Sequence, residues 1–240
     1  MLVMNNLLNY KDKYIFQDTD YFMMSLDSLL LSQFVTINLR DKKILDIATG
    51  NAPIPMLLTF RTKAHIYGVE LQKDVHLLGK ISISENEMKD QITLIHDDAK
   101  NLPNLFESDF FDIITCNPPY FKTKDARFEN SNDIKAIARH EKTLELDDVF
   151  RISRYLLKNN GRLAIIHRTE RIIEILDVMK KYGFELKKIR FVYPNKEKNS
   201  DLVLFECVKN GKPGLKMLPP LFVYKERGIY SDEVSTMFGE

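Results

Sequence analysis

The sequence is poor in the features that mark secreted, membrane-spanning or zinc-binding proteins. It holds two cysteines, and both Cys116 and Cys207 lie in apolar runs, as buried thiols of a reducing compartment do. No Cys/His cluster has zinc spacing, and no apolar run approaches the roughly 20 residues of a membrane span. Residues 1–13 lack a basic flank followed by an apolar core, so we expect no signal peptide. We therefore predict a soluble, cytoplasmic protein without a metal.

A strong overall charge is also lacking, since the formal net charge is +1, which argues against a generic nucleic-acid binder. The charge is unevenly distributed, however. Residues 151–240 hold 18 Lys and Arg against 11 Asp and Glu (+7), which leaves 17 against 23 (−6) for residues 1–150. This asymmetry suggests an acidic half for a cofactor and a basic half that meets phosphates, although solvated helices can produce it by chance.

The order of apolar runs predicts an α/β fold. Strands are expected at residues 42–47, 64–70, 92–96, 110–116, 163–167, 184–193 and 202–208. Helices are expected at 54–60, 73–88, 146–158 and 170–182, with Gly161 and Gly183 ending the last two. Strands that alternate with helices form a parallel sheet covered on both faces, and the last two strands form an antiparallel hairpin.

This arrangement resembles the Rossmann-like class I methyltransferases that depend on S-adenosylmethionine (SAM), with a seven-stranded, mostly parallel sheet and a terminal antiparallel strand. We expect one domain over residues 1–240, since 44% of the residues are apolar and can fill a large core. Within it, residues 1–40 would close over the cofactor and residues 41–210 would form the core. The tail, 211–240, shows no obvious regular structure.

A turn of small residues lies between the first expected strand and its helix. The family pattern there is Asp-x-Gly-x-Gly-x-Gly, and the chain has Asp46, Ala48, Gly50 and Ala52 at these positions. Small side chains let backbone amides approach a cofactor, and a helix N-terminus favours its carboxylate. The dinucleotide pattern Gly-x-Gly-x-x-Gly is absent, which argues against a dehydrogenase.

Acidic residues follow the next two expected strands, at the edge where such sheets bind ligands. Glu70 is placed to accept hydrogen bonds from both ribose hydroxyls of SAM, and Leu71 follows it. Asp98 is placed to accept from the adenine amino group, with the Ala99 backbone beside it; Asp97 is an alternative by one residue. A single acid at a strand end is more often simply solvated, so the order of the whole set carries the interpretation.

Two polar residues near the N-terminus, Ser25 and Asp27, precede the apolar positions of an expected helix. Either can cap that helix. In methyltransferases a segment at this position also closes over the methionine end of the cofactor, which is the second role that we assign to both.

The stretch Asn117-Pro118-Pro119-Tyr120 follows the fourth expected strand, and its two prolines end that strand. It resembles the catalytic tetrad of amino methyltransferases. In that family the Asn oxygen and the first Pro carbonyl accept hydrogen bonds from one planar NH2 group, and the Tyr ring stacks on the group that carries it. A strand end capped by proline is the structural alternative.

The whole chain is most similar to the bacterial tRNA (adenine-N6) methyltransferases that modify the adenine beside the anticodon of a valine tRNA. The matching segments are residues 22–30, 45–50, 68–71, 117–121, 139–141 and 219–224. The resemblance implies SAM as cofactor, S-adenosylhomocysteine (SAH) as product and tRNA as partner, and we favour a monomer. Candidate RNA contacts are Phe121, Lys122, Lys124, Arg139, His140, Lys196 and Lys198.

Three alternatives stay open: a methyltransferase of guanine N2 in rRNA, one of a protein glutamine, and a non-catalytic RNA-binding subunit. Glutamine enzymes usually carry a helical domain ahead of the cofactor turn, whereas 45 residues precede Asp46 here. DNA methyltransferases usually carry a large target-recognition domain, for which this chain has no room. A subunit without activity would have no chemical reason to keep the Asn117–Tyr120 tetrad.

Overall fold

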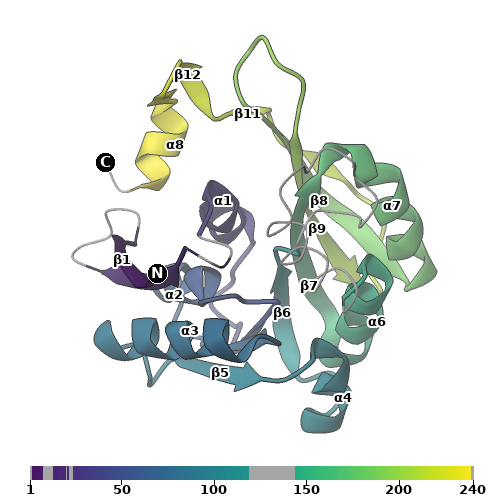
Figure 1. Cartoon of the computed structure of the whole chain (residues 1–240). Coiled ribbons are helices and arrows are strands. Elements are labelled where there is room, and N and C mark those ends of the chain that lie inside the picture. The colour runs from purple at the N-terminus through teal and green to yellow at the C-terminus, as the bar shows by residue number, and fades with distance from the viewer. Residues whose placement is uncertain (1, 8–12, 20, 22–23, 119–143, 239–240) are drawn as a thin grey trace, which may run out of the picture.

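The computed structural model describes residues 2–7, 13–19, 21, 24–118 and 144–238. Its main sheet has the order β5-β4-β3-β6-β7-β9-β8, with β10 and β11 both pairing with the outer edge of β8 (Figure 1). The seven central strands are β3 (Lys43–Ile47), β4 (His65–Glu70), β5 (Ile92–His96), β6 (Phe111–Cys116), β7 (Leu157–Arg168), β8 (Phe184–Tyr193) and β9 (Leu202–Lys209). The first five are parallel, and β9 runs antiparallel between β7 and β8. The expected α/β fold is confirmed.

Helices cover both faces of this sheet. They are α1 (Leu26–Phe34), α2 (Pro53–Thr59), α3 (Lys73–Glu85), α4 (Leu102–Leu105), α6 (Leu146–Leu156) and α7 (Ile172–Lys181). Alternate strand residues point to opposite faces, and accordingly Ile44 lies in the apolar cluster with α1, α2 and α3, whereas Leu45 lies in the cluster with α4, α6 and α7. The two cores therefore flank the sheet (Figure 1).

The boundary between α6 and β7 differs from the expectation. The helix predicted at 146–158 ends at Leu156, and Gly161 lies inside β7 instead of ending the helix. Leu157 already pairs with Phe111, and a register shift follows that pair. A Cβ on Gly161 would lie 2.8 Å from the Lys158 carbonyl oxygen, so glycine serves a close backbone approach at this irregularity. Gly183 ends α7 with a φ of 69°, as expected.

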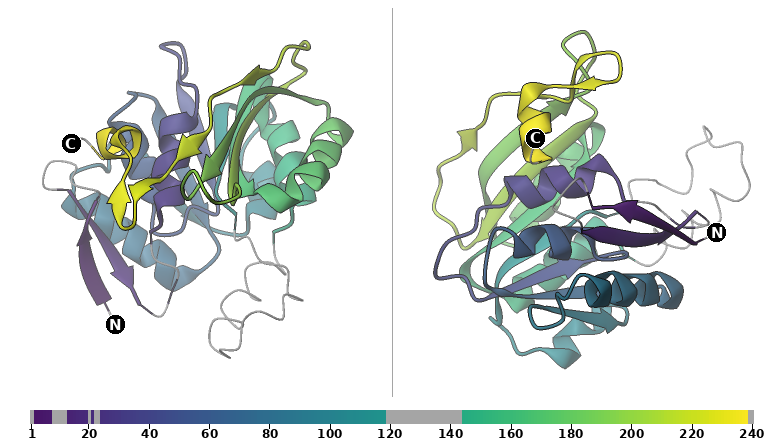
Figure 2. Two further views of the ribbon diagram at one scale, coloured as in Figure 1. Left: turned by 90° about the horizontal axis from the view of Figure 1, so that it is seen from above. Right: turned by 90° about the vertical axis from the view of Figure 1, so that its left-hand side faces the viewer.

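The expectation of an irregular tail is wrong. Strands β10 (Lys216–Met217) and β11 (Leu221–Phe222) pair with β8, and a small hairpin, β12 (Tyr224–Glu226) and β13 (Ile229–Tyr230), leads into α8 (Asp232–Met237). Apolar burial drives this order, because Leu221, Val223 and Val234 join the core cluster of α1. Figure 2 shows α8 lying beside α1.

The chain also begins with a hairpin that the apolar pattern did not reveal, β1 (Leu2–Asn6) and β2 (Tyr14–Asp18). It packs on α3 (Figures 1 and 2). Asn86 bonds both backbone groups of Tyr14, and the Ser82 hydroxyl accepts from the Phe16 amide at 2.9 Å. Among the described residues, β2 pairs with β1 on one edge only, and these side-chain bonds satisfy backbone groups on its other edge.

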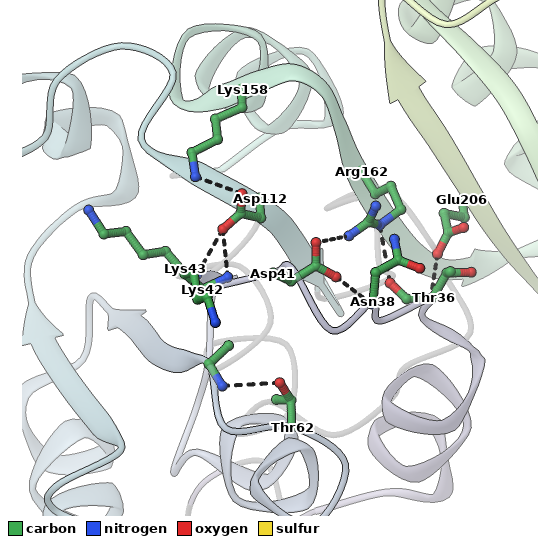
Figure 3. A network of polar contacts seen from close by, with 11 residues as sticks. Thr36, Asn38, Asp41, Lys42, Lys43, Thr62, Asp112, Lys158, Arg162 and Glu206 are labelled. Carbon is green, nitrogen blue, oxygen red and sulfur yellow. Dashed lines mark hydrogen bonds and ion pairs between the residues drawn. The ribbon is translucent and has the colours of Figure 1, made fainter.

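A polar network fixes the amino ends of the central strands (Figure 3). The Asp112 carboxylate accepts from the amides of Lys42 and Lys43 and pairs with Lys158 at 2.6 Å. Asp41 pairs with Arg162 at 2.5 Å. Although burial raises the pKa of Asp112, the hydrogen bond from Lys158 and the two amides hold it below its usual value. Residues 46–52 and 117–118 lie at the opposite, carboxyl edge of the sheet.

Candidate active site

The turn after β3 has a left-handed backbone at three alternate residues. Ala48, Gly50 and Ala52 have φ angles of 56°, 60° and 71°. Glycine tolerates this left-handed region freely, whereas alanine pays about 1–2 kcal/mol. The two alanines therefore adopt a backbone that the glycines of the family pattern would adopt at lower cost. A Cβ on Gly50 would meet nothing within 4 Å, so open space lies against the turn.

Glu70, at the end of β4, holds this turn in place. Its side chain is buried, and its Oε2 accepts from the Gly50 amide at 2.9 Å while its Oε1 accepts from the Gln72 amide at 2.9 Å. The Thr49 amide donates to the Val69 carbonyl at 2.9 Å. Each carboxylate oxygen can accept more than one hydrogen bond, so Glu70 retains acceptor capacity for a ligand.

Asp46 is a buried carboxyl that connects two strands. Its Oδ1 accepts from the Thr115 hydroxyl at 2.6 Å, and its Oδ2 accepts from the Thr49 hydroxyl at 2.7 Å. Burial raises the pKa of Asp46 to about 7, against the lowering effect of these two hydroxyls, and the nearby Glu70 raises it further. The residue is thus poised between its neutral and charged forms near neutral pH.

The register of β3 against β6 brings Asn117 and Pro118 to the turn. Asp46 pairs with Thr115 and Ile47 with Cys116, so Asn117 and Pro118 leave the sheet beside residues 48–52. Pro118 is buried and Asn117 is half-buried. The remaining tetrad residues, Pro119 and Tyr120, lie outside the described residues. So do Phe121, Lys122, Lys124, Arg139 and His140.

The acids after β5 bind their own loop. Asp98 Oδ1 accepts from the Lys100 amide at 2.9 Å and caps the short 3-10 helix Ala99–Asn101. Asp97 Oδ1 accepts from the Asp98 amide and from Asn101 Nδ2. The Asp97 amide also donates to the Glu70 carbonyl at 3.2 Å, which joins the ends of β4 and β5.

Ser25 does not cap α1 with its side chain, although it occupies the N-cap position. Its backbone is extended, and its Oγ is buried without a hydrogen-bond partner among the described residues. Asp27 lies in the first turn of the helix. Helix capping therefore does not account for the burial of the Ser25 hydroxyl. A buried hydroxyl without a hydrogen-bond partner is suited to bind a ligand.

Several residues of the site were not identified from the sequence. Thr49 and Thr115 hold Asp46, and Asn51 is buried with its Nδ2 donating to the Phe16 carbonyl at 2.8 Å. The last bond ties the N-terminal hairpin to the turn. In the sequence, each of these residues is a polar residue inside or next to an apolar strand end. This signal for a functional site is weak, because such residues usually serve local turns.

The basic candidates that the structure describes lie at the same edge of the sheet. Lys196 and Lys198 are exposed in the connection between β8 and β9. His167 and Arg168 pair with Val203 and Leu202, where β9 begins after that connection. The His167 imidazole is buried, and burial, followed by the charge of Arg171, lowers its pKa to about 3, so it is neutral at pH 7.

Comparisons with known proteins show the family of the chain. Residues 38–206 match the family model described as a methyltransferase domain. A protein of Cytophaga hutchinsonii named tRNA1(Val) (adenine(37)-N6)-methyltransferase is 24% identical over 194 residues, which are 81% of this chain and 80% of that protein. A protein of the same name from Vibrio campbellii is 25% identical over 219 residues, 90% of this chain and 87% of its own.

Solved structures share the fold. A crystal structure described as a predicted O-methyltransferase from Agrobacterium tumefaciens has a TM-score of 0.71 at 17% identity and covers 89% of this chain and 95% of its own. A geranyl diphosphate C-methyltransferase from Streptomyces coelicolor, solved with Mg2+, geranyl diphosphate and SAH, has a TM-score of 0.59 at 13% identity. It covers 77% of this chain and 80% of its own. In the described residues no helix has the length and apolar character to span a membrane.

Proposed function

Because this chain belongs to the family of methyltransferase domains, we propose that it transfers the methyl group of SAM to the N6 amine of an adenine in tRNA. The observation that carries the proposal is the pairing of Asp46 with Thr115. It brings the cofactor turn and the strand that leads to Asn117 to one point of the sheet edge. The names of the relatives support tRNA as the substrate class, with the adenine beside the anticodon of a valine tRNA as the specific target.

The residues around the turn fit SAM. The left-handed backbone at Ala48, Gly50 and Ala52 and the open space against Gly50 leave room for close approach. Glu70 would accept from the ribose hydroxyls, and its bond to the Gly50 amide sets its orientation. Bound SAM supplies an electrophilic methyl group on a sulfonium, and the chain's own residues bind and orient the two reactants.

The remaining cofactor contacts are assigned to the ends of neighbouring elements. Asp98 and the backbone of Ala99 would meet the adenine of SAM, beside the half-exposed Leu71. Ser25 and Asp27 would meet its methionine end, and the buried, unpaired Ser25 hydroxyl supports that role. Asp46 would act mainly through the turn, since both of its oxygens accept from threonine hydroxyls.

The tetrad would prepare the target amine. The lone pair of an exocyclic amine is delocalised into the ring, which makes the amine a poor nucleophile. Hydrogen bonds from the NH2 group to the Asn117 oxygen and the Pro118 carbonyl would favour the pyramidal form and aim the lone pair at the methyl group. Pro119 would restrict the backbone before Tyr120, and Tyr120 would stack on the adenine, which contributes about 1–3 kcal/mol per base.

Positive charges at this edge would hold the RNA. Lys196 and Lys198 are exposed in the connection between β8 and β9, and Phe121, Lys122, Lys124, Arg139 and His140 are candidates on the segment that follows the tetrad. The target adenine must be unstacked, which costs less in an anticodon loop than in a duplex. Phosphate contacts to these cations would position the loop without reading its sequence.

The test is methyl transfer from labelled SAM to separate pools of tRNA, rRNA and protein, with the Asn117→Ala variant as control. We expect label in tRNA alone, recovered as N6-methyladenosine, and its loss in the variant. Label in rRNA guanine or in protein glutamine would show that rRNA or protein, and not tRNA, is the substrate. SAM binding without transfer to any pool would favour a non-catalytic RNA-binding subunit.

A further inference from the structure

Gln17, on β2, is a buried polar residue that no part of the proposed site uses. Its side chain is 3% exposed, and its Oε1 accepts from Asn5 Nδ2 at 2.8 Å. Its Nε2 is buried without a hydrogen-bond partner among the described residues. Burying an amide end without a partner costs stability, so a folded protein that keeps one needs a reason for it.

The orientation of the amide groups does not remove this requirement. The two ends of a side-chain amide have nearly the same shape, and both amides can be reversed together. Gln17 Nε2 would then donate to the oxygen of Asn5, and Gln17 Oε1 would be left as a buried acceptor. In either orientation Asn5 satisfies one end of Gln17 and the other end stays available to a ligand.

The strand that carries Gln17 is attached to the cofactor turn. The Phe16 carbonyl, one residue before Gln17, accepts from Nδ2 of Asn51 at 2.8 Å, and Asn51 stands between Gly50 and Ala52. The Phe16 amide donates to Ser82 on α3. These bonds fix the position of β2 relative to residues 48–52.

The alternation of β2 tells which face carries Gln17. Ile15 and Gln17 are both buried and lie two residues apart, so they share one face of the strand. Ile15 belongs to the apolar cluster that contains Leu29 of α1 and Ala52 of the turn. The same cluster contains Ile83 of α3, on which the hairpin packs, so Gln17 lies on the buried face of the hairpin, toward the core that α1, α3 and the cofactor turn share. Another buried polar atom without a partner among the described residues, Ser25 Oγ, lies at the N-cap of α1.

We infer that Gln17 binds the amino-acid end of SAM and that the β1–β2 hairpin forms one wall of the cofactor site. This inference rests on the proposed function for the identity of the cofactor. The amino-acid end carries a carboxylate, which accepts from an amide N–H, and an ammonium, which donates to an amide oxygen. It therefore complements the unpaired end of Gln17 in both orientations.

The test compares two ligands that differ only in the proposed contact. SAH carries the amino-acid end, and 5′-methylthioadenosine is the corresponding nucleoside without it. In Gln17→Met, which keeps the size of the side chain and removes its polar end, we expect calorimetry to show about tenfold weaker binding of SAH. Binding of 5′-methylthioadenosine should stay within about twofold, because that ligand lacks the groups that Gln17 would meet. The melting temperature without ligand should change little, since the variant loses the bond to Asn5 together with the unpaired amide end.

Ile15→Val is the matched control, because it changes the same face of the same strand without a polar group. It should lower the melting temperature through a small cavity and leave the ratio of the two affinities unchanged. The inference is overturned if Gln17→Met binds SAH as the wild type does, or weakens both ligands equally. If the wild-type protein binds SAH, the cofactor assignment stands whatever the variant shows. If the wild-type protein does not bind SAH, the cofactor assignment and the role of Gln17 are both wrong.

Discussion

The Thr115 hydroxyl donates to Asp46 Oδ1 at 2.6 Å, and this bond joins the strand that leads to Asn117 to the strand that leads to the cofactor turn. Both residues are fully buried. The bond therefore lies beneath the site, two residues before the tetrad. It fixes the distance between two segments that must present cofactor and substrate to each other within near-attack geometry.

Thr115→Val should destabilise the protein by about 1–3 kcal/mol. Valine keeps the shape of threonine but leaves a buried Asp46 oxygen without its donor, and the loss of an unmatched buried partner costs that much. Thr93→Val is the matched control, because Thr93 is exposed and contacts His65 at the surface. The control should change the free energy of unfolding by less than about 0.5 kcal/mol. Equal unfolding midpoints in urea for the two variants would contradict the role given to this bond.

Asp46 and His167 should impose opposite pH dependences on stability. The pKa of Asp46 is raised to about 7, so its contribution is present below its unfolded value of 3.8 and is lost as the pH rises through 7. The pKa of His167 is lowered to about 3, so its contribution is present above its unfolded value of 6.5 and is lost as the pH falls. Between about pH 4 and 6.5 the two slopes oppose each other, each approaching about 1.4 kcal/mol per pH unit.

Single variants should separate the two groups. In Asp46→Asn the free energy of unfolding should rise more steeply with pH between 4.5 and 6.5 than in the wild type. In His167→Gln it should fall with pH relative to the wild type over the same range. Denaturant unfolding at three pH values measures both. Three parallel curves would show that neither group changes its charge on unfolding in this range.

Asn117→Ala should reduce kcat by about 100-fold or more and change the affinity for SAH and tRNA little. The proposed hydrogen bond to the target amine strengthens as the nitrogen becomes pyramidal and gains positive charge, so it acts mainly in the transition state. Asn117→Asp should retain more activity, because its carboxylate still offers an acceptor. Single-turnover rates and separate binding curves provide the measurement. Near wild-type methylation by Asn117→Ala would show that the tetrad is a structural strand end.

The double variant Lys196→Glu and Lys198→Glu should weaken tRNA binding and flatten its dependence on salt. Each phosphate contact that is lost removes roughly one released counterion from the salt slope. SAH affinity is the internal control and should not change, since both lysines lie in an exposed connection and neither is assigned to the cofactor. An unchanged salt slope would indicate that the segment after the tetrad, and not the two lysines, makes the phosphate contacts.

The central sheet could be predicted from the sequence because its strands are buried on both faces and read as short apolar runs between turns. The β8 bounds, Phe184–Tyr193, agree with the prediction at both ends. The N-terminal hairpin could not be predicted, because Leu2–Asn6 shows no alternation of apolar and polar residues. Its partner strand is held by Asn86 and Ser82, which are distant in the chain. Only the tertiary structure brings such partners together.

The site was predicted by residue type and only partly by geometry. Asp46, Gly50 and Glu70 were chosen for their places at or just after strand ends, and the structure places Glu70 against the Gly50 amide. The left-handed backbone of Ala48 and Ala52 could not be predicted, since alanine disfavours that region and the surrounding bonds enforce it. The reach of Asn51 to Phe16, 35 residues away in the chain, has no local signal.

The pairing of β10 and β11 along β8 has a consequence for how this protein behaves in concentrated solution. The outer edge of a sheet offers a row of amide and carbonyl groups on which a strand of another molecule can add. Residues 216–217 and 221–222 occupy that row in this chain, and Arg190 of β8 also holds Glu233 of α8 through two bonds of 2.7 and 2.8 Å. The tail thereby protects the sheet from edge-to-edge aggregation, and a chain that ended after β9 would expose β8 to self-association.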